Sequence, residues 1–459
     1  MDLLLLSRLQ FGLTIAFHYI YPPMSIGLGV VLVVMEVIWL RTGNELYHRM
    51  ARFWTKVFGL TFAIGVATGI VMEFQFGTNW AAYSRFVGDV FGSALAAEGI
   101  FAFFLESGFL AVLLFGWDKV SKRTHFVATC AVAFGATFSA LWIVVANSWQ
   151  QTPAGFHIVG EGAAARAEVT DFWAVVFNPS TMDRLSHVLC GAWQAGAFLV
   201  LSVSAYYLLR HRHEEFARAS MKIAMVVAGV ASILQLTTGH SSAVTVAKYQ
   251  PAKLAAYEAH YPESAAGTLW FFGLPDAQQE RVRFGIGLPG MLSYLVHGDA
   301  AVPIPGLRAF PPGDRPPVTV VFQSYHMMVA IGMALIGISL LGLLGWWRGF
   351  LFRCRWLLWA FVFAVLGPQF ANQLGWLSAE VGRQPWVVYG LLRTSEGLSR
   401  VVTAGMVLTS LILFSLVYLL LLVLFLFLLD RKIKHGPGDL VSGTDGPDDL
   451  KPQTGGHRA

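Results

Sequence analysis

The stretch that decides the fold is VVTAGMVLTSLILFSLVYLLLLVLFLFLL, from Val401 to Leu429. No charged side chain interrupts it. A hydrocarbon core of about 30 Å needs about 20 apolar residues in a helix, so this stretch predicts a transmembrane helix. Only 13% of the 459 residues are charged and 56% are hydrophobic, whereas soluble domains have about 25% charged residues. The composition therefore predicts an integral membrane protein.

Eight further apolar stretches precede this one, and together they predict an all-α membrane protein of about nine transmembrane helices. The nine predicted segments are roughly 11–39, 58–76, 93–116, 126–146, 185–209, 220–238, 321–346, 357–377 and 399–429. Pro22-Pro23 predicts a kink in the first segment. The predicted divisions are helices one to six (1–238), a long external loop (239–320), helices seven to nine (321–430) and a disordered cytoplasmic tail (431–459).

The basic residues predict the orientation in the membrane. The loops after the first, third, fifth and seventh segments, and the tail after the ninth, each carry three or four Lys or Arg residues. With nine helices, all five clusters fall on one side. Short cytoplasmic loops carry an excess of Lys and Arg, so that side is predicted to be cytoplasmic and the N-terminus to lie outside. The expected location is a bacterial cytoplasmic (inner) membrane.

Several classes of protein are not favoured. No basic run typical of a nucleic-acid-binding surface is present. The three cysteines, Cys130, Cys190 and Cys354, form no C-x-x-C pair or Cys/His cluster, which argues against disulfides, iron–sulfur clusters and covalent c-type heme. The N-terminus lacks the basic start and small-residue cleavage site of a signal peptide.

Ionisable side chains inside membrane segments are costly, so each is a functional candidate. If odd segments run from outside to inside, five potential iron ligands lie at one depth in the outer part of the membrane. They are His18, Glu98, His187, Met328 and Glu380. Imidazole and thioether groups are normal axial ligands of heme. Five such groups on five helices indicate a layer of cofactors.

A simpler interpretation stays open for each of these residues. A lone intramembrane histidine is also a common hydrogen-bonded packing residue, and a methionine in a span is usually core filler. Glu380 and Arg383 can pair at an interface. Their shared depth favours the ligand interpretation for the group.

Five strings are similar to subunit I of cytochrome bd ubiquinol oxidases. They are SRLQFGLT from Ser7, GVATGIVMEFQFGTNW from Gly65, AAEGIFAFFLES from Ala96, SALWIVVANSWQQTP from Ser139 and GRQPW from Gly382. GWDK follows at Gly116, and a Gly-Trp pair at 375–376 precedes GRQPW. The resemblance extends to about residue 430 and is weakest in the external loop.

The resemblance implies a low-spin heme b held by His187 and Met328. It also implies a high-spin heme b and a heme d, or a further heme b in place of the latter. His18 matches a histidine ligand of a high-spin heme, although which of the two it serves stays open. Glu98 matches the acidic residue at the oxygen-reducing heme.

Glu380, four residues after the cofactor-binding Trp376, matches the glutamate ligand of the other high-spin heme, with Arg383 beside it. Lys253 and Glu258, within PAKLAAYEAH, match the quinol-binding pair of the external loop. An alternative for that pair is an exposed salt bridge. The resemblance further implies a homologous second membrane subunit and a possible small single-helix subunit.

The sequence departs from the family pattern at three places. His326 stands where the family often has Arg two residues before the methionine ligand, and is expected to alter the charge near the low-spin heme. TTGHSSA from Thr237 replaces an acidic string after segment six. The external loop is of the short type.

The function expected is oxidation of quinol at the external loop and reduction of dioxygen to water at the high-spin hemes. Two rivals are a heme electron-transfer subunit that is not an oxidase and a proton-coupled transporter. Glu106 lies about 12 Å deeper than Glu98 on one helix. With Ser107 and Ser139 it is expected to belong to a proton-uptake route from the cytoplasm. The alternative is a protonated Glu106 hydrogen-bonded to a neighbouring helix.

Overall fold

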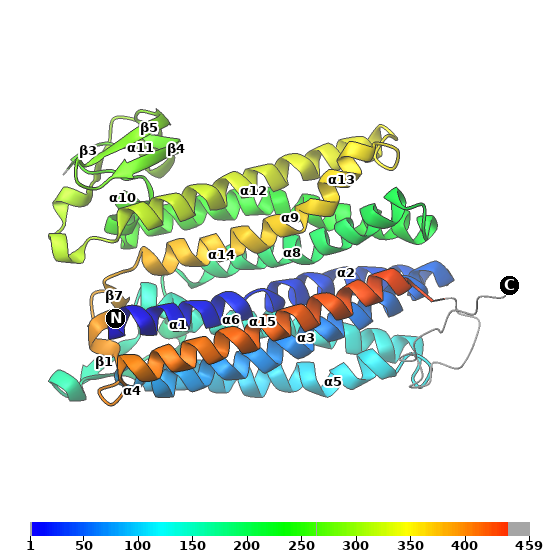
Figure 1. The fold of residues 1–459 in the computed structure, drawn as a ribbon, viewed down its shortest axis with the longest axis horizontal. Coiled ribbons are helices and arrows are strands. Elements are labelled where there is room, and N and C mark those ends of the chain that lie inside the picture. Colours follow the sequence, from blue (N-terminus) through cyan, green and yellow to red (C-terminus); the bar gives the residue numbers. More distant parts are fainter. Residues whose placement is uncertain (1, 263, 439–459) are drawn as a thin grey trace.

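The structure, a computed structural model, describes residues 2–262 and 264–438. Within those ranges, nine helical segments are long and apolar enough to cross a membrane. Figure 1 shows them side by side with their long axes nearly parallel. The predicted all-α architecture of nine spanning helices is therefore confirmed.

Six of the spanning segments are unbroken helices: α3 (Glu45–Thr78), α6 (Lys122–Gln151), α8 (Thr181–Leu209), α9 (Glu214–Tyr249), α12 (Val318–Trp347) and α15 (Ala404–His435). The other three are divided. They consist of α1 (Leu3–His18) followed by α2 (Tyr21–Thr42), of α4 (Ala81–Ala97) joined by the π-helix η1 (Glu98–Phe103) to α5 (Phe104–Phe115), and of α13 (Arg355–Ala364) followed by α14 (Leu366–Val381).

The first and third segments are interrupted for local reasons. Pro22 and Pro23 lie in the first turn of α2, where a missing backbone N–H costs nothing, so the chain breaks between α1 and α2 and starts a new helix there. This confirms the predicted kink. In the third segment the π-helix starts at Glu98. Single π turns inside α-helices occur mostly at functional sites.

The sixth spanning helix is longer than its apolar core predicts. It ends at Tyr249 rather than near residue 238, because the chain stays helical until the residues that precede Pro251, where a proline disfavours the α conformation. TTGHSSA therefore lies in α9 and not in a loop. The third segment likewise begins at Ala81, twelve residues before position 93.

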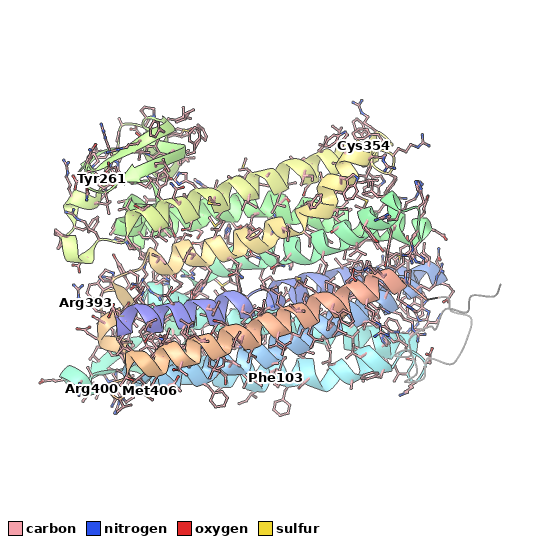
Figure 2. The ribbon with its side chains drawn as sticks, viewed as in Figure 1. Phe103, Tyr261, Cys354, Arg393, Arg400 and Met406 are labelled. Carbon is pink, nitrogen blue, oxygen red and sulfur yellow. The ribbon has the colours of Figure 1, made fainter. Side chains whose placement is uncertain are left out.

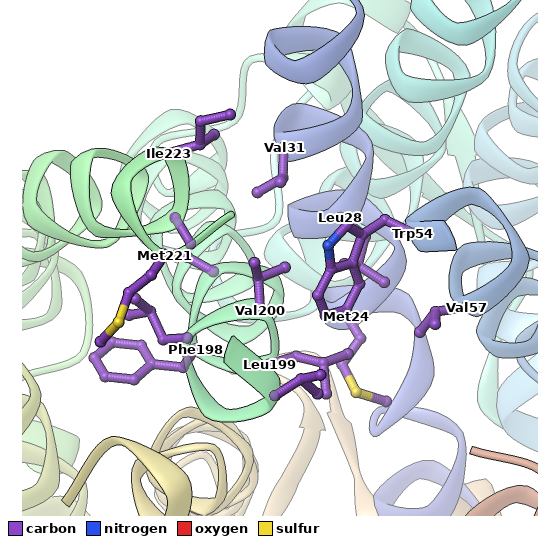
Figure 3. Close-up of a cluster of buried hydrophobic side chains, with 14 of the residues drawn as sticks. Met24, Leu28, Val31, Trp54, Val57, Phe198, Leu199, Val200, Met221 and Ile223 are labelled. Carbon is purple, nitrogen blue, oxygen red and sulfur yellow. The ribbon is translucent and has the colours of Figure 1, made fainter. Parts of the chain in front are cut away.

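The centre of the bundle is α8, which packs against α2 and α9. Side chains from α2, α3, α8 and α9 meet there in one apolar cluster, in which Leu28, Trp54, Phe198 and Met221 are fully or almost fully buried (Figure 3). The backbones of α2 and α8 touch at Gly27 and Gly196. A Cβ atom on Gly196 would lie 2.2 Å from the carbonyl carbon of Gly27. Small residues allow such close helix contacts within membranes.

The residues between α9 and α12 fold into a small ordered unit. It contains α10 (Pro251–Tyr257), α11 (Met291–His297), the hairpin of β4 (Leu269–Asp276) and β5 (Arg281–Leu288), and the paired strands β3 (Ser264–Ala266) and β6 (Pro303–Pro305). Tyr261 lies in it (Figure 2). We call the end of the bundle that carries this unit the loop end.

Two smaller hairpins and a short helix lie at the same end (Figure 1). They are β1 (Phe156–Val159) with β2 (Arg166–Val169), α7 (Phe172–Val176), and β7 (Trp386–Val388) with β8 (Leu392–Arg393). The connections after α2, α5, α8 and α12, and the end of α15, lie at the opposite end. The five predicted basic clusters are therefore together at that opposite end.

Candidate functional site

A single large cavity runs between the helices in the loop half of the bundle. Its volume is about 2130 Å³, whereas sites for one small molecule have volumes of about 300–1,000 Å³. Nine of the ten residues singled out in the sequence line it: His18, Glu98, Glu106, His187, Lys253, Met328, Trp376, Glu380 and Arg383. The tenth, Glu258, does not. The candidate ligands that the sequence places at one depth thus line one cavity.

His18, the last residue of α1, is oriented by α3. Its Nδ1 atom lies 3.0 Å from the hydroxyl of Thr68. That hydroxyl already donates to the carbonyl of Ile64, at 2.9 Å, so it accepts a hydrogen bond from Nδ1–H. The Nε2 atom then keeps its lone pair, as a metal-ligating histidine requires. A Cβ atom on Gly69 would lie 3.2 Å from the imidazole carbon Cε1.

His187, on α8, has the same surroundings built from α9. Its Nδ1 atom lies 3.2 Å from the hydroxyl of Thr238, which donates to the carbonyl of Leu234 at 2.8 Å. A Cβ atom on Gly239 would lie 3.3 Å from Cε1 of His187. The amide nitrogen of Gln235 is 2.9 Å from Nε2.

A Thr-Gly pair therefore holds each candidate histidine: Thr68-Gly69 for His18, and Thr238-Gly239 for His187. The threonine fixes the tautomer and the glycine leaves room for the ring. These pairs were not predicted as part of the site, although the repeated Thr-Gly dipeptide is the sequence signal that marks both positions. The unusual TTGHSSA string supplies the second pair.

Met328, on α12, also faces a glycine. A Cβ atom on Gly375 of α14 would lie 2.8 Å from the sulfur of Met328. Trp376, the next residue, lines the same cavity. Gly375 therefore leaves room for the sulfur of Met328, and Trp376 contributes an aromatic side chain to the cavity wall.

Glu380 lies in the last turn of α14 and is held by a buried polar network. Its Oε1 atom accepts hydrogen bonds from the amides of Asn147 and Gln151, both at 3.1 Å. Its Oε2 atom forms an ion pair with Arg383. Asn147 and Gln151 come from the last turns of α6, so α6 and α14 together position the carboxylate.

Two further cations are attached to that network. Arg184 donates to the side-chain oxygen of Asn147, and the amine of Lys253 donates to that of Gln151 at 2.5 Å. Arg184 precedes His187 by about one turn of α8. Sequence analysis missed Asn147, Gln151 and Arg184, because only the tertiary structure brings α6, α8 and α10 to Glu380.

The network has an excess of positive charge. Lys253 is 3% exposed and Arg383 is 4% exposed, yet among the described residues Glu380 is the only carboxylate in contact with this group of three cations. Burial, followed by repulsion from Arg184 and Arg383, holds the pKa of Lys253 well below its usual range. One nitrogen of Arg383, Nη1, has no hydrogen-bond partner among the described residues. Buried cations need compensation, so the cavity suits an anionic ligand.

Glu98 and Glu106 lie on the far wall, beside α6. Glu98 accepts a hydrogen bond of 2.7 Å from the hydroxyl of Ser139. Glu106 packs against Gly135, where a Cβ atom would lie 2.6 Å from its Cγ. Ser139, which the sequence grouped with Glu106 in a proton route, bonds Glu98 instead. Ser107 is exposed and donates to the carbonyl of Phe103 at 2.8 Å, so it does not face Glu106.

Lys253 and Glu258 do not form a pair in the described part of the chain. Glu258 is 1% exposed and accepts a hydrogen bond of 3.1 Å from the backbone N–H of Trp270. The alternative of an exposed salt bridge is therefore wrong. The two side chains diverge, since Lys253 reaches the cavity and Glu258 turns toward β4.

His326 is the charged partner of Glu258. Its Nδ1 atom is 2.9 Å from the carbonyl of Phe322 and its Nε2 atom is 3.0 Å from the carbonyl of Trp270. Carbonyls only accept, so both nitrogens carry protons and the ring is an imidazolium. A carboxylate oxygen of Glu258 lies 3.7 Å from Nε2. The position where the family often has Arg thus keeps a positive charge, neutralised by Glu258.

A family model, cytochrome bd terminal oxidase subunit I, matches residues 6–437. The chain belongs to this family. Cytochrome bd ubiquinol oxidase subunit 1 of Bacillus subtilis is 40% identical over 95% of this chain and 94% of its own length. The cytochrome bd-II ubiquinol oxidase subunit 1 of Escherichia coli is 35% identical over 96% of this chain and 98% of its own length. A putative bd menaquinol oxidase subunit I of B. subtilis is 34% identical over 92% of this chain and 94% of its own length.

The fold agrees with a solved member of the family. The bd oxidase structure from Geobacillus thermodenitrificans superposes with a TM-score of 0.87 at 30% identity, and covers 95% of this chain and 99% of the matched chain. Together with the nine spanning helices, the family makes this cytochrome bd subunit a multi-pass protein of the bacterial inner membrane, as predicted.

A cytochrome carries heme, and the cavity fits that group. His18 has a free Nε2 lone pair, and among the described residues the Nε2 atom of His187 meets only the side-chain amide of Gln235. Gly375 leaves room for the thioether of Met328, and the cavity volume exceeds that of a single small-molecule site. The carboxylate groups of heme also supply the negative charge that the network around Glu380 lacks.

Proposed function

We propose that the chain is the heme-bearing subunit of a terminal oxidase that oxidises quinol and reduces dioxygen to water. The observation that carries this proposal is the single cavity, in which oriented histidines, a thioether and a cation-rich carboxylate network lie together. The quinol-oxidase names of the bacterial relatives support it.

His187 and Met328 would hold a low-spin heme b. His187 would offer an imidazole and Met328 a thioether, both of which are normal axial ligands of heme, and a heme held by both would serve electron transfer rather than oxygen binding. Thr238 keeps the imidazole in the tautomer whose Nε2 faces the cavity. Gly239 and Gly375 keep the space beside the two ligands clear.

His18, Glu98 and Glu380 would hold or tune the two high-spin hemes, one of type b and the other of type d or again b. These hemes would relay electrons from quinol and would supply the oxygen-binding position. A carboxylate is a hard ligand and favours the high-spin state. Arg383, Asn147 and Gln151 fix the orientation of Glu380, and Trp376 packs on the cavity wall.

The quinol site would lie at the loop end, between α10 and the β4–β5 hairpin. Glu258 is the proton acceptor that quinol oxidation needs, and the adjacent imidazolium of His326 stabilises its charged form. Lys253 connects this region to the cavity, since its amine bonds Gln151 and thereby reaches Glu380.

Protons for water formation would come from the opposite end of the bundle. Five basic clusters lie at that end, so it faces the cytoplasm by the positive-inside rule, and the N-terminus lies outside. Glu106 is a buried carboxylate on the cytoplasmic side of Glu98, and it would pass protons from that end toward the oxygen site. Uptake from the cytoplasm makes the reaction electrogenic.

The working enzyme would contain a homologous second membrane subunit, and also a small single-helix subunit. Several spanning segments are largely unburied within this chain: 11% of the most apolar window of α15 is buried, and 17% of that of the third segment. Phe103 and Met406 point away from the bundle (Figure 2). Lipid and partner helices would cover these faces.

A spectrum and an oxygen measurement test the proposal. We expect the purified complex to show b-type absorption in a reduced-minus-oxidised spectrum and to consume oxygen when supplied with reduced ubiquinol or menaquinol. A coloured complex without oxygen uptake would identify an electron-transfer subunit instead. A colourless protein would favour the transporter alternative.

A further inference from the structure

A second buried polar cluster lies outside the cavity, in the half of the bundle toward the opposite end. Glu36 of α2 and His125 and Thr129 of α6 are 0%, 1% and 1% exposed. The Nδ1 atom of His125 is 3.1 Å from one carboxyl oxygen of Glu36. The hydroxyl of Thr129 donates to the other carboxyl oxygen at 2.6 Å. None of the three lines the cavity.

The hydrogen bonds fix how many protons this cluster holds. The Nε2 atom of His125 lies 3.2 Å from the carbonyl of Leu113 on α5, and a carbonyl only accepts, so Nε2 carries a proton. The contact between Nδ1 and Glu36 then needs one more proton, on either the nitrogen or the oxygen. Glu36 and His125 therefore share one mobile proton and are neutral together.

We propose that Glu36, His125 and Thr129 form the proton-loading site for oxygen reduction, from which protons pass along α6 to Glu106. This inference rests on the proposed uptake route through Glu106. It assigns the first buried station of that route, and places it within this chain.

The position along α6 supports this assignment. α6 carries His125 and Thr129 near its start, then Gly135 against Glu106, then Ser139 bonded to Glu98. The rise from Thr129 to Gly135 is about 9 Å, and from Gly135 to Ser139 about 6 Å. All four positions fall within about 120° of the helix circumference. One side of α6 therefore connects the cluster to both carboxylates of the oxygen site.

The surroundings place the cluster close to the surface of the opposite end but shield it from water. His125 is one turn from the start of α6, and the ring of Trp117 lies 3.8 Å from its imidazole. The amine of Lys122 lies over the ring of Trp39, 4.7 Å from its centroid. His48 stacks on Trp39 on the other side. Lys122, His48 and Cys130 are neighbouring titratable groups, together with Glu45, which bonds His48, and Asp118, which pairs with Arg52. Glu45 and Asp118 are exposed, so Glu36 is the fully buried carboxylate of this region that can hold the transferred proton.

The transfer step moves one proton and no other atom. The shared proton leaves Glu36, passes through intervening water, and forms an O–H bond on Glu106. The Thr129 hydroxyl stabilises the carboxylate left on Glu36. A proton from the opposite end then restores the bond between Glu36 and His125. The charge of the pair alternates between 0 and −1.

A purely structural tie between α2 and α6 would not need these residue types. An amide in place of Glu36 would keep the bonds to Thr129 and His125 without the cost of an ionisable group in a membrane. Glu36→Gln and Thr129→Val therefore separate the two roles. The first removes the titratable group, and the second keeps the shape of the side chain but removes the hydroxyl.

The test uses the complete complex with its hemes. Proton uptake is followed with a pH indicator after the fully reduced enzyme is mixed with oxygen. We expect both variants to keep normal heme spectra and normal oxygen binding, and to take up protons at least about tenfold more slowly. Thr129→Ser should restore the rate. Thr61→Val is the matched control, because Thr61 is fully buried and bonds only its own helix.

Uptake within twofold of the parent rate in both variants, with intact hemes, would overturn the inference. If Glu106→Gln slows uptake in the same experiment while the cluster variants do not, only the loading site is wrong. If Glu106→Gln is also normal, the uptake route itself is wrong. Should Glu36→Gln fail to assemble, Thr129→Val and its serine rescue decide the result.

Discussion

At the scale of single residues, the proposed heme ligands are oriented by side chains and glycines of neighbouring helices. The Thr-Gly pairs beside His18 and His187 are one device, and the glycine opposite Met328 is another. Each fixes a ligand through a neighbour on a different helix. Substitution of the ligand should therefore remove one heme without unfolding the bundle.

Replacement of His187 by Ala or of Met328 by Leu should abolish the six-coordinate b-type signal and stop quinol oxidation. Either change removes one axial ligand of the low-spin heme. The reduced-minus-oxidised spectrum reports the loss. Met406→Leu is the control, since Met406 is 59% exposed and does not line the cavity. An unchanged low-spin spectrum in both ligand variants would contradict the assignment.

Removal of Glu380 should be more damaging than removal of a surface carboxylate. Glu380→Ala leaves the buried Arg383 without its anion, and breaking a buried ion pair costs about 3–5 kcal/mol. We expect loss of one high-spin heme, loss of turnover and a lower thermal midpoint. Heme content and unfolding in detergent measure these effects. Glu161→Ala, on an exposed loop, should behave like the parent, and full activity of Glu380→Ala would refute the role.

At the scale of elements, the contact between α2 and α8 sets the geometry of the cavity. His187 and Arg184 extend from α8, and α1 brings His18 to the same space. The backbones meet at Gly27 and Gly196 without room for a Cβ atom. Helix separation at this point would move the ligands of two hemes.

Gly196→Ala should destabilise the subunit by about 1–3 kcal/mol, because the added methyl group forces the two backbones apart. The change in thermal midpoint and in heme retention measures this. Gly337→Ala is the matched control, since a Cβ atom there meets nothing within 4 Å. If both variants unfold at the parent temperature, the close contact does not hold the helices together.

At the scale of the whole molecule, the basic connections and the loop unit with the cavity lie at opposite ends of the bundle, which indicates one orientation in the membrane. The loop unit and the cavity share one end, and the basic connections share the other. Under the proposed function, this arrangement would separate quinol oxidation at the loop end from proton uptake at the opposite end.

The orientation can be tested with single cysteines in a background where the three native ones are replaced by Ser. A membrane-impermeant maleimide added to intact spheroplasts should label Asp299→Cys, which is exposed in the loop unit. It should label Lys119→Cys only after permeabilisation. The reverse pattern would place the N-terminus inside.

The lengths of the apolar segments and the positions of the basic loops predicted the spanning helices and their orientation from the sequence alone. Apolar segments specify spanning helices because an unpaired backbone group is costly in lipid. Motif strings then indicated the family and ten candidate site residues, of which nine line the cavity. Helix ends were less predictable, as α9 shows, because polar turns continue a helix beyond the membrane core until a residue such as Pro251 stops it.

Only the tertiary structure decided which residues act together. The sequence placed Lys253 beside Glu258, but packing turns their side chains apart, Lys253 to the Glu380 network and Glu258 to His326. Ser139 bonds Glu98 rather than approaching Glu106. Arg184 and Asn147 lie on different helices, α8 and α6, yet meet in the structure. Glu36 and His125, on α2 and α6, do the same. Such contacts follow from helix rotation and packing, which apolar composition alone leaves free in a bundle surrounded by lipid.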